Sequence, residues 1–256
     1  MKQSKSLGQI FLKDKNYIQK ILDSLNVSGE TVLEIGPGPG EISGQIANKC
    51  KFLYGVEFDP RFAEALTEKF HSRNNIKIIH SDILKFSLED IGEKMVVFGN
   101  VPYQISNAII AYLIENRALI KNAYLTFQRE VVDKLIAKVS TKDYSFLTCY
   151  AQYYAKVNKL FDIPRGAFVP IPKVISSFIE VRFDDPSLPK VKDEKLLFEI
   201  IRQAFSQRRK KIANSLSRFC SDIDFLSTLK IDKNMRAENI PLAQYILIAD
   251  ALSNML

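Results

Sequence analysis

Short apolar runs alternate with longer amphipathic stretches between about residue 16 and residue 184. Buried strands that alternate with helices in this way are typical of a largely parallel sheet with helices on its faces. The runs that we predict as strands are 31–35, 52–57, 76–79, 95–98, 123–127, 155–161 and 176–183. The helices predicted before and between them are 17–25, 41–48, 60–70, 106–115, 130–138 and 144–154. About seven strands exceed what a minimal nucleotide-binding unit needs, and they predict an α/β, Rossmann-like sheet.

The composition changes after Asp185 and Pro186, where the tripeptide Ser187-Leu188-Pro189 resembles a linker. Beyond it the periodicity indicates only helices, at 194–205, 210–219, 223–229 and 242–255. The sequence therefore predicts two domains, one of residues 1–185 around the sheet and a small all-helical one of residues 186–256.

The composition excludes several kinds of site. The cysteines are odd in number and widely spaced, with no C-x-x-C pair, so neither a disulfide framework nor a zinc site is encoded. With only His71 and His80, a Ser-His or Cys-His nucleophilic system has little material. The chain starts without the apolar core of a signal peptide, and its apolar stretches are too short to cross a bilayer. We therefore expect a cytoplasmic protein with neither a metal ion nor a membrane partner.

Lysine and arginine exceed aspartate and glutamate by 36 to 29, which gives a formal net charge of +7. Such a surplus favours a polyanionic partner such as nucleic acid. The same charge spread evenly over the surface would mean only good solubility. The composition leaves both interpretations open.

A glycine-rich segment, Gly36-Pro37-Gly38-Pro39-Gly40, joins the first predicted strand to a helix. Strand, glycine-rich turn and helix together let the backbone approach a ligand at the carboxyl end of the strand. A dinucleotide site expects G-x-G-x-x-G, but Glu41 stands where the last glycine would be. An acidic side chain there repels a pyrophosphate, whereas S-adenosylmethionine has no phosphate and tolerates it.

Carboxylates follow the next two predicted strands. Glu57 closes the second strand and can accept hydrogen bonds from both hydroxyls of a ribose. Asp82 follows the third strand and can accept from an adenine amine. A solvated strand end or a helix cap would explain either acid alone. Acids at successive strand ends make that explanation less satisfactory and favour a nucleoside site.

The fourth predicted strand ends in Asn100-Val101-Pro102-Tyr103. A plain turn explains Asn and Pro in isolation. At this strand end, however, the Asn100 amide oxygen and the Val101 carbonyl can accept both hydrogens of an exocyclic amine, which frees its lone pair for an electrophilic methyl group. Pro102 stiffens the loop, and Tyr103 offers a ring for an extruded base. A sulfonium donor is already activated, so no strong general base is required.

Several blocks, taken in order, resemble the ribosomal RNA adenine N6,N6-dimethyltransferases of the small subunit, the KsgA type. The blocks are KSLGQIFL (5–12), EIGPG (34–38), VEFD (56–59), SD (81–82), GNVPY (99–103), QREV (128–131) and FVPIPKV (168–174). The resemblance covers most of the chain and implies a class I methyltransferase sheet that uses S-adenosyl-L-methionine.

The resemblance also implies a set of site residues. Its cofactor site would comprise Ile10, Leu12, Gly36, Glu57, Asp82 and Asn100. The family usually has Asn or His where this chain has Ile10, so we expect Ile10 to border the cofactor through its backbone and without a side-chain hydrogen bond. Val101 replaces the commoner Leu without consequence, because only its carbonyl is asked to act. Phe168 is either a core aromatic residue or the second ring that packs on the target adenine.

Four consecutive cations, Arg208 to Lys211, lie beyond the predicted boundary. Charge runs are usually solvated faces, but the family uses a similar segment near its RNA. We therefore expect Arg208, Arg209, Lys210 and Lys211 to contact phosphates, with Lys2, Lys5, Lys13 and Lys15 as a possible second cluster. Such contacts position RNA without reading its sequence.

The resemblance implies dimethylation of N6 of two adjacent adenosines in a hairpin near the 3′ end of small-subunit (16S) rRNA. The expected partner is an immature small subunit, and the expected enzyme is a monomer. Two alternatives stay open. One is a large-subunit dimethyltransferase of the macrolide-resistance type, and the other is a ribosome-assembly factor whose catalysis is secondary or lost.

Overall fold

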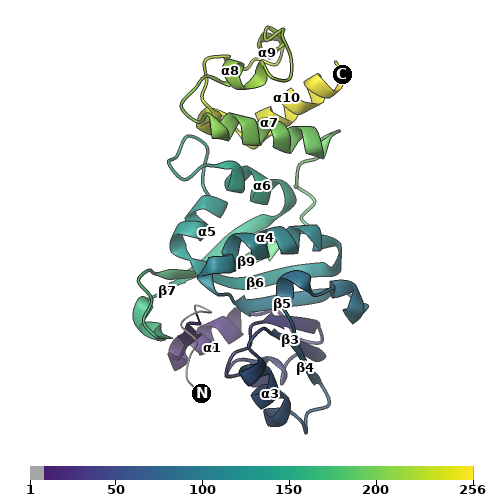
Figure 1. Cartoon of the computed structure of the whole chain (residues 1–256), viewed down its shortest axis with the longest axis vertical. Helices are drawn as coiled ribbons and strands as arrows, with labels where there is room; N and C mark the ends of the chain where they lie inside the picture. Colours follow the sequence, from purple (N-terminus) through teal and green to yellow (C-terminus); the bar gives the residue numbers. More distant parts are fainter. Residues whose placement is uncertain (1–8, 256) are drawn as a thin grey trace. The chain divides into compact units, whose positions relative to one another are not determined.

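The computed structural model describes residues 9–255, and its contacts divide the chain into two compact units (Figure 1). The sheet unit contains the described residues up to Val132 together with Val157–Asp184. The helical unit contains Asp133–Lys156 and the described residues from Asp185 onward. None of the described helices is long and apolar enough to span a membrane.

A seven-stranded sheet forms the centre of the sheet unit, in the order β4-β3-β2-β5-β6-β9-β7. Its strands are β2 (Thr31–Ile35), β3 (Phe52–Glu57), β4 (Ile76–His80), β5 (Met95–Asn100), β6 (Ile120–Gln128), β7 (Lys156–Ile163) and β9 (Ser176–Arg182). The neighbours from β4 to β6 pair in parallel, while β9 runs antiparallel to β6. Each of these strands was predicted from the apolar runs, and the predicted α/β sheet is confirmed.

The register of the sheet brings the strand ends that carry the motifs together. Ile35 at the end of β2 pairs with Val56 of β3 on one side and with Gly99 of β5 on the other. All five residues of β2 are buried, as expected for a central parallel strand covered on both faces. The strands β3 and β4 follow on one side of β2, and β5 lies on its other side. Ligands of open α/β sheets bind where the strand order reverses in this way.

The helices of the sheet unit are α1 (Lys15–Ser24), α2 (Ser43–Ile46), α3 (Pro60–Lys69), α4 (Ser106–Glu115) and α5 (Arg129–Leu135). The Asp59 side chain caps α3 by accepting from the Arg61 N–H, and Pro60 occupies the first turn. The helix predicted at 41–48 is only the single turn α2. Turns flank it on both sides, and Gly44 within it disfavours a longer helix.

A second, two-stranded sheet was not predicted from the sequence. It pairs β1 (Phe11–Leu12) antiparallel with β8 (Phe168–Val169), so that Leu12 lies opposite Phe168. Strands of two residues have no readable periodicity, and these two lie far apart in the chain. Their pairing could therefore not be predicted from the sequence.

The helical unit contains α6 (Phe146–Tyr154), α7 (Glu194–Ser206), α8 (Ile212–Leu216), α9 (Phe225–Thr228) and α10 (Leu242–Ser253). Its core includes Leu197, Ile200 and Tyr245, together with Tyr144 and Cys149. The helical part is thus larger than residues 186–256, because the segment Asp133–Lys156 belongs to it as well. The Tyr144 hydroxyl donates to the Ile240 carbonyl at 3.1 Å, which ties this segment to the C-terminal helices.

Arg208, expected among the phosphate contacts, is instead engaged within the helical unit. Its guanidinium donates to Glu238 at 2.5 Å and to the Lys142 carbonyl at 2.7 Å. Arg208 therefore connects the two parts of the chain that form the helical unit, Asp133–Lys156 and the residues from Asp185 onward. Lys211 similarly donates to Asn234 at 2.7 Å. Arg209 and Lys210 are exposed.

We predict that Arg208→Ala lowers the melting temperature of the protein, because it removes three hydrogen bonds and the ion pair with Glu238. The expected loss is about 1–2 kcal/mol. The matched variant Arg209→Ala, at an exposed neighbour, should melt within about 1 °C of the wild type, as surface substitutions usually do. Differential scanning calorimetry of both variants checks this, and equal melting temperatures would contradict a structural role for Arg208.

Candidate cofactor and catalytic site

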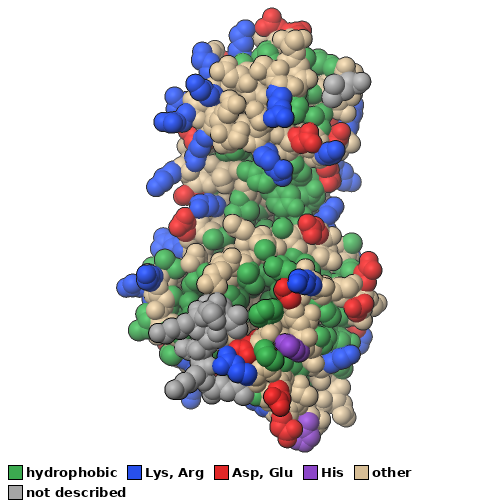
Figure 2. All heavy atoms as spheres, in the orientation of Figure 1, with side chains coloured by type: hydrophobic (Ala, Val, Ile, Leu, Met, Phe, Trp, Pro, Cys, Tyr) green, Lys and Arg blue, Asp and Glu red, His purple; other side chains and the backbone are tan. Residues whose placement is uncertain are grey.

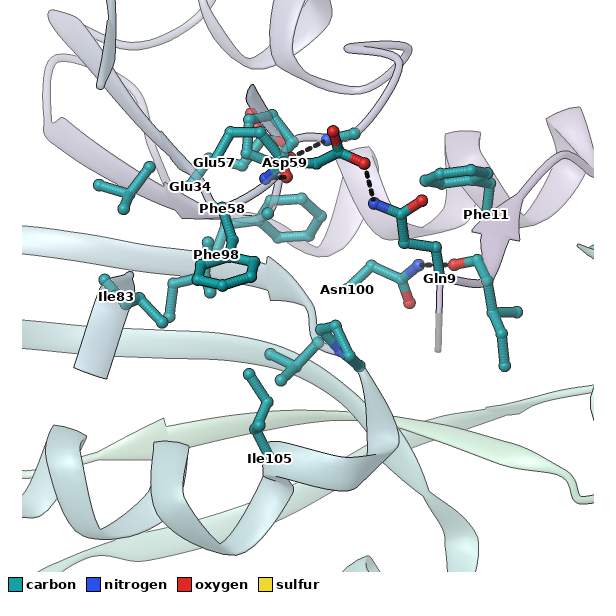
Figure 3. Close-up of a pocket in the computed structure, with 18 of the residues that line it drawn as sticks. Gln9, Phe11, Glu34, Glu57, Phe58, Asp59, Ile83, Phe98, Asn100 and Ile105 are labelled. Atoms are coloured by element: carbon teal, nitrogen blue, oxygen red, sulfur yellow. Dashed lines mark hydrogen bonds between the residues drawn. The ribbon is translucent and has the colours of Figure 1, made fainter. Parts of the chain in front are cut away.

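A pocket opens at the carboxyl ends of β2 to β5, where the predicted motifs converge (Figure 3). It is lined by residues 9–12, by parts of 34–42, by 56–59, 81–84 and 100–105, and by Phe98 and Phe168. Every residue that the sequence assigned to the cofactor or to catalysis lines it: Ile10, Leu12, Gly36, Glu57, Asp82, Asn100, Val101, Pro102, Tyr103 and Phe168. The fold therefore gathers six separate segments of the chain at one site.

The glycine-rich loop is shaped by glycine's conformational freedom. Gly36 and Gly38 have φ angles of +65° and +55°, a region that other residues rarely adopt. A Cβ atom on Gly38 would also lie 2.7 Å from the ring of Phe11. The loop thus presents bare backbone to the pocket while residue 11 packs directly against it.

Glu57 lies at the centre of the site and is almost fully buried. Its Oε2 accepts from the Gly38 N–H and its Oε1 from the Asp59 N–H, both at 2.9 Å. Burial raises the pKa of this carboxyl, although the two backbone donors lower it in part. Each carboxylate oxygen has a second lone pair, so two further donors such as ribose hydroxyls can still be accepted.

Asp82 caps a turn and also lines the pocket. Its Oδ1 accepts from the Leu84 N–H at 3.0 Å and caps a short 3₁₀ turn. The side chain is half-buried and also lines the pocket. A helix cap is thus compatible with a binding role, because capping occupies one lone pair and holds the carboxylate in place.

Asn100 is oriented by the amino-terminal segment. Its Nδ2 donates to the Ile10 carbonyl at 3.2 Å, as the dashed line in Figure 3 marks. This bond sets the amide orientation, in which Oδ1 is the acceptor end. Ile10 therefore takes part through its backbone, as expected of a residue that cannot form a side-chain hydrogen bond.

The loop that follows Asn100 is anchored by burial and by a contact with β9. Val101 is buried, and the Tyr103 hydroxyl shares a hydrogen bond of 2.5 Å with Ser176 Oγ at the start of β9. Burial raises the pKa of Tyr103, so the phenol stays neutral. The ring is half-buried and fixed at both its backbone and its hydroxyl, which suits a platform for a flat ligand.

Phe168 is 1% exposed and belongs to the same core as Leu12 and Phe178. It is a core aromatic residue that also forms part of the pocket wall. Leu12, its partner in the β1–β8 pair, is likewise buried.

Three further pocket residues were not assigned from the sequence. Phe58 is 55% exposed beside Glu57, and a large apolar residue directly after a predicted ribose carboxylate was the available signal. Gln9 donates to Asp59 at 3.0 Å within the same site. Both side chains belong to blocks that the resemblance already contained, yet nothing in one sequence shows which residues of a block face a ligand.

Glu34 is the third of these pocket residues without a role assigned from the sequence. An acid within the apolar run 31–35 was the available sign that it is unusual. The side chain is 3% exposed, and its Oε2 has no hydrogen-bond partner among the described residues. Burial raises its pKa to about 7, with a further contribution from Glu57, while Ser43 and Lys69 offset only part of this. The pocket floor therefore holds a carboxyl group with an open hydrogen-bonding position.

The cations expected near the amino terminus divide into different environments. Lys13 forms an exposed ion pair with Glu41, so the acid at the start of the α2 segment is locally compensated. Lys15 is exposed at the start of α1. Lys2 and Lys5 lie outside the described residues. Within residues 9–255 no group of His, Cys, Asp and Glu side chains has the arrangement of a metal site.

We predict that Glu34→Gln stabilises the ligand-free protein at pH 8 and not at pH 4.5. The folded protein holds this proton up to about pH 7, whereas an ordinary glutamate releases it near 4.5. The free energy of unfolding therefore falls as pH rises through that window, by up to about 3 kcal/mol. Urea titrations at both pH values measure the difference. The exposed Glu64→Gln is the control, and an equal effect in the two variants at pH 8 would refute the prediction.

The chain was compared with known families, sequences and structures. A family model described as ribosomal RNA adenine dimethylase matches residues 1–254. The ribosomal RNA small subunit methyltransferase A of Desulforapulum autotrophicum is 40% identical over 262 residues, which cover 98% of this chain and 92% of the relative. The protein of the same name from Aromatoleum aromaticum is 37% identical over 250 residues, covering 97% and 94%.

A solved dimethyladenosine transferase from Plasmodium falciparum superposes with a TM-score of 0.82, covering 95% of this chain and 98% of that one. Its sequence identity is 23%, so this likeness shows the fold alone, and it confirms a Rossmann-like methyltransferase sheet. The family match over nearly the whole chain and the sequence identities of 37–40% show the family as well as the fold. The chain belongs to the ribosomal RNA adenine dimethylase family.

Proposed function

We propose that this protein transfers methyl groups from S-adenosyl-L-methionine to N6 of two adjacent adenosines near the 3′ end of small-subunit rRNA. The observation that carries the proposal is the Asn100 amide, held with its acceptor end available beside a nucleoside-type carboxylate site. Support for the small subunit comes from the relatives named ribosomal RNA small subunit methyltransferase A, which match this chain over almost its full length.

The pocket fits S-adenosyl-L-methionine group by group. Glu57 retains acceptor positions for the ribose hydroxyls, and Asp82 has a carboxylate for the adenine amine. Phe58 offers an exposed apolar ring beside them. The bare backbone at Gly36 and Gly38 admits the chain of the ligand. When bound, this cofactor supplies a methyl group already activated by its sulfonium.

The chain's own residues then prepare the target amine. Asn100 Oδ1 and the Val101 carbonyl accept its two hydrogens, which favours a tetrahedral nitrogen and frees the lone pair for attack. Tyr103, fixed by Ser176, supports the extruded base. Phe168 closes the wall behind it. The proton released from the amine passes to solvent, since no strong base is needed after the methyl transfer.

The RNA is held by exposed cations that carry no sequence information. Arg209 and Lys210 are exposed in the helical unit, whereas Arg208 is engaged in its own unit. Figure 2 shows Lys and Arg side chains distributed over the visible face of the helical unit. A positive charge that is distributed over the surface suits a structured RNA, such as that of an immature small subunit. We propose that the enzyme acts on this subunit as a monomer, in the cytoplasm.

The large-subunit enzyme and the assembly factor are supported to different degrees. A large-subunit enzyme of the macrolide-resistance type is not favoured, because the relatives that match nearly the whole chain bear the small-subunit name. A role in ribosome assembly is compatible with methylation, since both use the same RNA surface. Intact Asn100-Val101-Pro102-Tyr103 argues against an assembly factor that has lost catalysis.

We predict that Asn100→Ala lowers the rate of methyl transfer by at least about 100-fold, as loss of a transition-state hydrogen bond does. Binding of immature small subunits should be largely retained, because RNA is held by other residues. Asn107→Ala, at an exposed position of α4, is the matched control. Methyl incorporation and filter binding are measured on the same preparations, and parallel loss of both in Asn100→Ala would make Asn100 structural.

We predict that the wild-type enzyme forms N6,N6-dimethyladenosine in small-subunit rRNA. Mass spectrometry of nuclease digests should locate it at two adjacent adenosines, with immature subunits as the preferred substrate over naked rRNA. Both rRNAs are offered in parallel reactions with the same cofactor. Modification confined to large-subunit rRNA would overturn the proposed substrate while leaving the reaction chemistry intact.

A further inference from the structure

We propose that Gln9 is a positioning residue that links the cofactor carboxylate to the catalytic amide. It lies in an amino-terminal strap, residues 9–12, whose residues line the pocket between Glu57 and Asn100 (Figure 3). This inference rests on the proposed function, because it assigns the orientation of the Asn100 amide to contacts that the strap makes with the rest of the site.

A continuous series of hydrogen bonds carries the inference. The Asp59 N–H donates to Glu57 Oε1 at 2.9 Å, and Asp59 Oδ2 accepts from Gln9 Nε2 at 3.0 Å. The next residue of the strap, Ile10, accepts from Asn100 Nδ2 at 3.2 Å. Two strand ends on opposite sides of β2 are thereby joined through a segment that lies far from both in the sequence.

The acceptor of this series is itself held rigidly. Asp59 is 1% exposed and accepts from Arg61 Nε at 2.9 Å and from Arg61 Nη2 at 2.6 Å. These bonds, with that from Gln9, lower the pKa of Asp59 to about 2, so it is a carboxylate at any working pH. The bond from Gln9 is therefore charge-assisted, which makes it stronger than a bond between neutral groups.

The strap has separate anchors at its two ends. Downstream, β1 pairs with β8, the Lys13 N–H donates to the Ala167 carbonyl at 2.8 Å, and Phe11 packs edge-on against Phe62. Upstream, Gln9 bonds to Asp59. Loss of the Gln9 side chain should therefore leave the strap folded while the Ile10 carbonyl loses its fixed position.

The position of that carbonyl matters because the two ends of an amide have nearly the same shape. A rotation of 180° would turn the NH₂ group of Asn100 toward the hydrogens of the target amine and remove the acceptor. The Ile10 carbonyl can accept only from Nδ2, so it selects the productive orientation. Donors that occupy the free lone pairs of Glu57 act on the same series, which links cofactor binding to the orientation of Asn100.

The first test compares Gln9→Ala with Gln19→Ala, an exposed glutamine of α1 that serves as the control. Gln9→Ala should lower kcat about 10-fold, which corresponds to about 1.4 kcal/mol of lost orientation. The KM for rRNA should stay within about twofold, because the phosphate contacts are untouched. The melting temperature should fall only modestly, because one side-chain hydrogen bond to Asp59 is lost while the core is unchanged. Equal kcat values in the two variants, or a loss confined to KM, would overturn the proposal.

A second variant supplies a pH signature that a packing role would not produce. Gln9→Glu keeps the side-chain length but replaces the amide donor by a carboxyl group, which can donate to Asp59 Oδ2 only when it is protonated. Its kcat relative to wild type should be about 10-fold low at pH 8 and should recover as the pH falls, because the protonated group donates to Asp59. A pH-independent ratio would contradict the assigned bond.

A third test uses NMR spectroscopy and does not depend on methyl transfer. The ¹⁵N-labelled Asn100 side-chain amide, assigned by its absence in Asn100→Ala, should shift when S-adenosylhomocysteine binds the wild type and should shift less in Gln9→Ala. An identical shift in both proteins would overturn the link. If the wild type fails to methylate rRNA at all, the proposed function fails, whereas the amide resonances still test the hydrogen-bond series in the ligand-free protein.

Discussion

The Glu57 carboxylate, which accepts two backbone N–H groups, holds the site together. Its bonds to Gly38 and Asp59 tie the glycine-rich loop after β2 to the turn that begins α3. The register Ile35 to Val56 and to Gly99 brings these turns beside the end of β5. A carboxylate buried with two fixed donors stays aligned without a ligand, so the binding groups are ordered before any cofactor arrives.

Two acids of the site cap a helix or a turn and also have a second contact or position in the pocket. Asp59 caps α3 and accepts from Gln9, and Asp82 caps a 3₁₀ turn at the pocket. A carboxylate has more lone pairs than one cap uses, so capping is compatible with the proposed binding role. Glu34 differs, because one of its buried oxygens has no hydrogen-bond partner within residues 9–255, and such an oxygen costs stability.

Much of this arrangement was predictable, and the exceptions share a cause. Local apolar patterns predicted all seven strands of the central sheet, and ordered motifs predicted residues from Ile10 to Phe168 that do line one pocket. The roles of Arg208 and of the segment Asp133–Lys156 were not predictable, because their partners lie tens of residues away. The length of α2 was overestimated, because the spacing of apolar residues does not reflect how much a central glycine destabilises a helix.

The sequence by itself determined the class of sheet, the glycine-rich loop, the acids at the strand ends and the family, because these depend on local periodicity and on ordered motifs. Only the tertiary structure decided which way the Asn100 amide points, which buried carboxylate oxygen no residue of 9–255 satisfies, and which cations of the run 208–211 are engaged internally. Hydrogen bonds and burial depend on groups brought together by folding, such as Ile10 and Asn100, and no local pattern encodes those distances.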